Sequence, residues 1–141
     1  MLVEPHARSR KMLASMLAGV ADVDAYHDFL SARHTVFGTP YDLLVTQVRL
    51  GLYNGLHLAY LARPHVMRRV VYASSTDLVI AREAQSAGAF YETAERLPFV
   101  LLHYVTLALP SVDRRDPSRW DRRSNSRGGR RVTDVALMHA T

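Results

Sequence analysis

Few side chains in this 141-residue sequence have both the type and the spacing that chemistry requires. Because the chain contains no cysteine, thiol nucleophiles, thiolate metal sites and disulfides are excluded. The seven histidines show neither a His-x-x-x-His nor a His-x-His spacing, so His57 and His103 are better explained as helix residues than as metal ligands. Ser74 and Ser75 lack the flanking glycines of a nucleophile elbow, and the glycine-framed stretch 51–55 lacks the lysine of a phosphate-binding loop.

Polar residues stand instead at the ends of predicted strands. Glu4 follows the apolar pair Leu2-Val3, and Gln47 follows the apolar run from Asp42 to Thr46. Ser74 and Thr93 follow two later strand-like runs. Parallel strands present their carboxyl ends at one edge of a sheet, where a functional crevice is expected. The sequence therefore predicts a functional crevice at that edge.

The elements that position these residues alternate regularly between strand and helix patterns. We expect strands at 2–4, 23–26, 42–46, 70–73 and 89–92, and helices at about 12–20, 28–36, 55–62, 76–87 and 97–108. Ser75 or Thr76 is expected to cap the fourth helix, and Pro98 stands in the first turn of the last one. Five such units predict an α/β fold, a doubly wound parallel sheet with helices on both faces.

Several stretches resemble the receiver domain of two-component response regulators. The stretch from Asp42 to Leu56 is similar to the family's third strand, phosphoacceptor loop and third-helix start. Val70 to Ser75 is similar to the fourth strand, with Ser74 as the switch hydroxyl, and Ala87-Gly88-Ala89 is similar to the approach to the fifth. The resemblance covers residues 1–109 and implies a flavodoxin-like sheet in the order 2-1-3-4-5. Residues 110–141 are predicted to form a separate arginine-rich tail.

The resemblance also implies a phosphorylation site whose key groups this sequence replaces. A receiver accepts phosphate on an aspartate, and the matching residue here is Gln47, whose neutral amide is a poor nucleophile. The acidic pair that holds a divalent cation is reduced to Glu4 beside Pro5. The lysine that balances phosphoryl charge is matched by Thr93, or by Ala94 if the loop is aligned differently.

The chain's sole lysine is Lys11, so no alignment restores a lysine at that place. We therefore expect a pseudo-receiver without enzymatic activity or a cofactor, and with weak or absent Mg²⁺ binding. A chemically altered but switchable site, using Ser74, Ser75 or His6, is the alternative.

The expected function is phosphorylation-independent protein interaction in signal transduction. The resemblance implies a histidine kinase, another receiver or an effector as the partner. The family commonly uses the face of the fourth helix, fifth strand and fifth helix for partners and dimers. On that face we expect Arg82, His103 and either Phe90 or Tyr91, which match the aromatic switch position.

Most of the net charge of +5 lies in the tail, where eight arginines against four aspartates give +4 for residues 111–141. One interpretation is a nucleic-acid-associated transcriptional regulator that uses Arg114, Arg115, Trp120, Arg122 and Arg123. Another is a solvated extension whose aspartates pair with its arginines. The tail could also fold back or dock on a partner through Trp120 and the apolar stretch from Val135 to Met138. A third class, a small-ligand binder or enzyme, would use the crevice beside Gln47, Glu4 and Ser74.

The apolar runs are too short to span a bilayer, and the first residues lack the layout of a signal peptide. We therefore expect a cytoplasmic protein without a membrane partner.

Overall fold

A computed structural model describes residues 1–108 of the chain. Its strands are β1 (Leu2–Val3), β2 (Ala25–Tyr26), β3 (Tyr41–Gln47), β4 (Arg49–Leu50), β5 (Tyr53–Asn54), β6 (Val66–Ala73) and β7 (Phe90–Thr93). Its helices are α1 (Ala7–Leu17), α2 (Phe29–Val36), α3 (Gly55–Ala62), α4 (Leu78–Ser86) and α5 (Leu97–Thr106). Among these helices, none combines the length and the apolar character needed to cross a bilayer.

The main sheet has five parallel strands in the order β2-β1-β3-β6-β7. In terms of the five predicted strands this order is 2-1-3-4-5, so the predicted α/β fold is confirmed. Leu44, Val45 and Thr46 of β3 are all buried, as expected for a central parallel strand covered on both faces.

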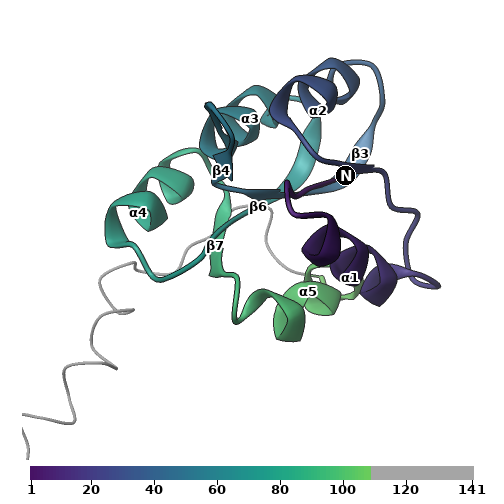
Figure 1. The fold of residues 1–141 in the computed structure, drawn as a ribbon. Helices are drawn as coiled ribbons and strands as arrows, with labels where there is room; N and C mark the ends of the chain where they lie inside the picture. The colour runs from purple at the N-terminus through teal and green to yellow at the C-terminus, as the bar shows by residue number, and fades with distance from the viewer. Residues whose placement is uncertain (109–141) are drawn as a thin grey trace, which may run out of the picture.

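Helices cover the two faces of the sheet (Figure 1). α1 and α5 lie together on one face, whereas α2, α3 and α4 cover the other. Val45 and Val70 pack toward α1 and α5, while their neighbours Leu44 and Val71 pack toward the opposite helices. This division follows from the two-residue period of a strand, which points successive side chains to opposite faces.

A small β-hairpin, formed by β4 and β5, follows β3 and was not predicted beyond a turn. Gly51 has a φ of 67° and Leu52 does not have a positive φ, which matches a two-residue turn with glycine at its first position. Tyr53 of the hairpin stacks on Phe29 of α2 with ring centroids 4.7 Å apart. The loop between β3 and α3 is therefore attached to the neighbouring helix.

The prediction for the start of α4 was wrong by one or two residues. The capping side chain is Asp77, which accepts hydrogen bonds from the backbone N–H groups of Val79 at 2.9 Å and Ile80 at 3.2 Å. Ser75 and Thr76 precede this cap and are exposed. A carboxylate was the stronger capping candidate because it accepts both orphan N–H groups.

β6 begins four residues earlier than predicted because two arginines do not interrupt it. Arg68 Nη1 donates to the carbonyls of Tyr104 and Leu107 at the end of α5. Arg69 is only 4% exposed, and its Nη2 donates to the carbonyl of Gly88 at 3.0 Å. Burial, and secondarily the charge of Arg63, lower the pKa of Arg69. Both guanidinium groups thus donate hydrogen bonds to carbonyls at or just beyond helix ends.

Candidate functional site

Gln47 stands at the carboxyl end of β3, at the edge where the crevice was predicted. It pairs in register with Tyr72 of β6. Its side-chain oxygen accepts the backbone N–H of Arg49 at 3.0 Å, so the amide helps to hold the start of the β4–β5 hairpin. The Gln47 side chain therefore has a structural role, because it holds the backbone that follows β3.

Glu4, directly after β1, is turned into the interior and is 2% exposed. One carboxylate oxygen accepts the backbone N–H of His6 at 2.7 Å, and the other accepts the hydroxyl of Tyr72. Burial raises the pKa of Tyr72, and the hydrogen bond to Glu4 and its charge raise it further. The carboxylate is thus satisfied inside the protein.

The other predicted site residues do not contribute to the hydrogen bonds of the Glu4 carboxylate. Pro5 is half-buried, and its carbonyl accepts from Arg10 at 3.1 Å. Ser74 is exposed and lies two residues beyond Tyr72, the residue that faces Gln47. The Thr93 hydroxyl accepts the backbone N–H of Arg96 at 3.3 Å.

One small pocket of about 170 Å³ does bring two predicted residues together. We call it the carboxyl-edge pocket; it is lined by Gln47, Val48, Arg49, Ala73, Ser74, Ser75, Asp77 and Ile80. Glu4, Pro5 and Thr93 do not line it. Its volume is below the usual range for drug-sized ligands, about 300–1,000 Å³.

The donor groups at this edge do not fit Mg²⁺, the ion that the resemblance implies. Mg²⁺ takes oxygen ligands in near-octahedral geometry, usually with one or two carboxylates. Within residues 1–108 no group of three or more histidine, aspartate or glutamate side chains could hold a metal ion. Glu4 already accepts two hydrogen bonds, and Gln47 is neutral. Weak or absent Mg²⁺ binding remains a prediction.

The face predicted to bind partners presents only part of its expected residues. Arg82 on α4 and His103 on α5 are exposed. Phe90 is 6% exposed and packs edge-on against Tyr104, with centroids 5.1 Å apart. Tyr91 is 1% exposed, and its hydroxyl donates to the Ser75 carbonyl at 2.8 Å and accepts the Asp77 N–H at 3.1 Å. Neither aromatic ring is available to a partner in this conformation.

Two exposed apolar side chains on this face were missed in the sequence. Phe99 on α5 is 81% exposed and Val79 on α4 is 69% exposed. A signal for Phe99 existed, because it falls outside the apolar stripe of Leu97, Leu101 and Tyr104, which the structure buries.

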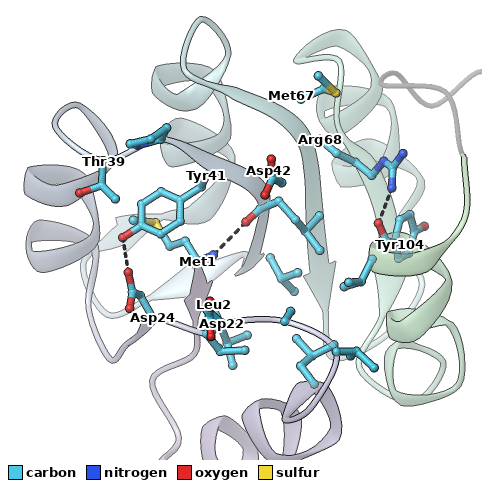
Figure 2. Close-up of a pocket in the computed structure, with 18 residues that line it drawn as sticks. Met1, Leu2, Asp22, Asp24, Thr39, Tyr41, Asp42, Met67, Arg68 and Tyr104 are labelled. Carbon is cyan, nitrogen blue, oxygen red and sulfur yellow. Dashed lines mark hydrogen bonds between the residues drawn. The ribbon is translucent and has the colours of Figure 1, made fainter.

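A larger pocket of about 510 Å³ lies at the opposite, amino-terminal edge of the sheet (Figure 2). We call it the amino-edge pocket. Its lining includes the apolar residues Leu2, Leu17, Leu43, Val45 and Val105, and the acids Asp22, Asp24 and Asp42. The sequence analysis missed it because Asp22 and Asp24 lie in the loop between α1 and β2, whereas Asp42 lies at the start of β3.

Two interactions organise the pocket. The Tyr41 hydroxyl donates to Asp24 at 2.7 Å, and the pKa of Tyr41 is raised by burial and by its hydrogen bonds to Tyr26 and Asp24. The Met1 amino group donates to the Leu43 carbonyl at 2.9 Å. Burial lowers the pKa of this amino group to about 6, against the opposing charges of Asp24 and Asp42.

The predicted nucleic-acid residues, Arg114, Arg115, Trp120, Arg122 and Arg123, lie outside the described residues.

Three of the solved structures with a similar fold are response regulators or their receiver domains. One is a LuxR-family two-component response regulator from an Aurantimonas species, with a TM-score of 0.66 and 23% identity over 73% of this chain and 78% of that chain. Another is DrrB of Thermotoga maritima, an OmpR/PhoB homologue, with a TM-score of 0.62 and 19% identity over 72% of this chain and 48% of that chain. A third is the BeF3-activated DrrB receiver domain, with a TM-score of 0.60 and 17% identity over 73% of this chain and 92% of that chain.

No protein-family model and no curated protein matches the sequence. At these identities the structural likeness establishes the fold alone, which is that of response-regulator receiver domains.

Proposed function

We propose that this chain is a receiver-like module of two-component signalling that binds protein partners without being phosphorylated on an aspartate. The observation that carries the proposal is that a neutral amide, and not a carboxylate, stands at the end of β3. Gln47 stands at the tip of β3 and uses its amide oxygen to accept the Arg49 N–H. An acyl phosphate requires a carboxylate oxygen as the nucleophile, and the amide does not supply one.

The surroundings of Gln47 support the same function. Glu4 is buried and is held by Tyr72 and the His6 N–H, so its charge is committed to the fold. The sole lysine, Lys11, is an exposed residue of α1 and is not part of β7. A phosphoryl group carries about −1.5 to −2 at neutral pH, and no lysine is available at this edge to balance that charge.

Partner binding is assigned to the surface of α4, β7 and α5. Arg82, His103, Val79 and Phe99 are exposed there, which combines charge with a large aromatic side chain. Aromatic side chains and arginine are enriched at the centres of protein interfaces. The expected occupant is a kinase, another receiver or an effector, or a second copy in a two-fold dimer.

Incubation with acetyl phosphate and Mg²⁺, followed by intact-mass measurement, tests whether the chain accepts a phosphoryl group. We expect no phosphoryl adduct on the unmodified chain, and none on Q47N, a control that keeps an amide. Q47D asks whether a carboxylate alone restores acceptance, and we expect little adduct because the lysine is still missing. A stoichiometric adduct on the unmodified chain contradicts the proposal.

Sedimentation velocity over a range of protein concentrations tests whether the surface of α4, β7 and α5 forms a dimer. R82E is expected to weaken self-association about tenfold, whereas R33E, which reverses an exposed charge on α2, leaves it unchanged. Equal effects of the two variants, or a monomer at every concentration, would rule out the two-fold dimer.

A further inference from the structure

We propose that the amino-edge pocket is the docking site for this chain's own segment 114–123. The segment reads Arg-Arg-Asp-Pro-Ser-Arg-Trp-Asp-Arg-Arg. Its arginines would face the acidic mouth of the pocket, and Trp120 would enter the apolar interior.

The pocket has the size and lining of a binding site. At about 510 Å³ it is three times as large as the carboxyl-edge pocket, and it falls within the range of ligand sites. Apolar side chains from β1, β3, α1 and α5 line it, and Asp22, Asp24 and Asp42 stand exposed around it. An apolar interior with a charged rim fits an aromatic side chain flanked by ions of opposite sign.

The described part of the chain balances the negative charge of the pocket only in part, through Arg68 and the Met1 amino group, which line it beside three aspartates. Within residues 1–108, Asp22, Asp24 and Asp42 form no ion pair with a cationic side chain. Arg68 also lines the pocket, but Figure 2 shows its guanidinium directed to the Tyr104 carbonyl at the end of α5. An excess of carboxylates therefore faces solvent at this edge.

The segment has the complementary composition. Its five arginines and two aspartates give a net charge of +3 within ten residues. It also contains Trp120, the only tryptophan of the chain. Arginine and tryptophan are both among the residue types enriched in the dominant contacts of interfaces.

The position of the chain exit places the segment within reach. Tyr104 and Val105 of α5 line the pocket, and the carbonyl of Leu107 accepts from Arg68 in the same wall. Arg114 follows Ala108 by six residues, which span at most about 20 Å when extended. A short connection of this kind gives an effective concentration in the millimolar range, so even weak contacts would hold the segment in place.

Acrylamide quenching of tryptophan fluorescence in the full chain tests the proposal, because Trp120 is the only emitter of its kind. The test variant D22N/D42N removes two exposed charges and keeps Asp24, which holds Tyr41. The matched control E83Q/E95Q removes two exposed charges from α4 and the β7–α5 loop. Circular dichroism confirms that each variant is folded.

We expect Trp120 to be protected in the unmodified chain and in the control. In D22N/D42N, and in the unmodified chain at high salt, the ratio of docked to free segment should fall about tenfold. Protection should not depend on protein concentration.

Three outcomes would overturn the proposal. Trp120 could be as open to acrylamide in the unmodified chain as in urea, which would mean that the segment does not dock. D22N/D42N could leave the protection unchanged, which would place the docking site elsewhere. Protection could arise only as the concentration rises, which would show that the pocket takes the segment of a second copy.

Discussion

The two edges of the sheet use their carboxylates in opposite ways. At the carboxyl-terminal edge, Glu4 is buried and both of its oxygens accept hydrogen bonds, and the pocket at this edge, which Glu4 does not line, has a volume of about 170 Å³. At the amino-terminal edge, Asp22, Asp24 and Asp42 are exposed around a pocket of about 510 Å³. The pocket at the edge where ligands bind in sheets of this kind is therefore the smaller of the two, and the three exposed aspartates stand at the opposite edge.

The difference shows how burial decides what a charge does. A carboxylate taken out of water is costly unless it is fully hydrogen-bonded, so Glu4 must keep its partners and acts as part of the fold. Exposed carboxylates have no such requirement and remain available to a cationic ligand. The packing and hydrogen bonds of the carboxyl-terminal edge can each be tested by substitution.

The largest effect is expected at Gly55, directly behind Gln47. A Cβ atom there would stand 2.0 Å from the Gln47 carbonyl oxygen and 2.9 Å from the Thr46 hydroxyl. G55A should therefore lower the free energy of unfolding in urea by about 3 kcal/mol. For G38A, where no atom lies within 4 Å of the added Cβ, we expect a change of less than about 1 kcal/mol. Similar costs for the two variants would show that this edge can relax.

The next effect concerns the hydrogen bond between Tyr72 and Glu4. Y72F removes the hydroxyl and leaves one buried carboxylate oxygen without its donor, which should cost about 2 kcal/mol of unfolding free energy. Y60F removes a hydroxyl from a tyrosine that is 44% exposed and should change stability by less than about 0.5 kcal/mol. If Y72F were as stable as the unmodified chain, the Glu4 carboxylate would not be held by the Tyr72 hydroxyl.

Alkaline pH should weaken the same contact. The pKa of Tyr72 is raised in the folded chain, whereas a tyrosine in the unfolded chain ionises near its ordinary value of about 10. The stabilisation is therefore complete below about pH 10 and is lost as pH rises above it, by at most about 1.4 kcal/mol per pH unit for this residue. Urea unfolding at several alkaline pH values should give a shallower loss for Y72F. Equal slopes would exclude Tyr72 as the cause.

The smallest effect is expected at the start of α4, where Asp77 lines the carboxyl-edge pocket. D77A should cost about 1 kcal/mol because the N–H groups of Val79 and Ile80 lose their acceptor. T76A should change stability by less than about 0.5 kcal/mol, since the hydroxyl does not cap the helix. A larger loss of stability for T76A than for D77A would show that Thr76 caps the helix.

Much of the fold could be predicted because it depends on local patterns. The apolar run of β3 and the stripe of α5 indicated buried elements, and the alternation of strands and helices indicated a parallel sheet. The β4–β5 hairpin was harder to predict, because two-residue strands are too short to show a period. The early start of β6 was missed because arginine is rarely buried, and here carbonyls at the ends of α4 and α5 accept from the two arginines.

The amino-acid sequence by itself determined which chemical groups stand at the strand ends, and so the absence of an aspartate at position 47 and of any lysine except Lys11. Only the tertiary structure decided that Glu4 turns inward to Tyr72, a residue 68 positions away, and that Asp42 lies at the same pocket as Asp22 and Asp24. The physical reason is that residue type and period are properties of neighbouring positions. Burial and pairing depend on what the packing of remote elements brings into contact.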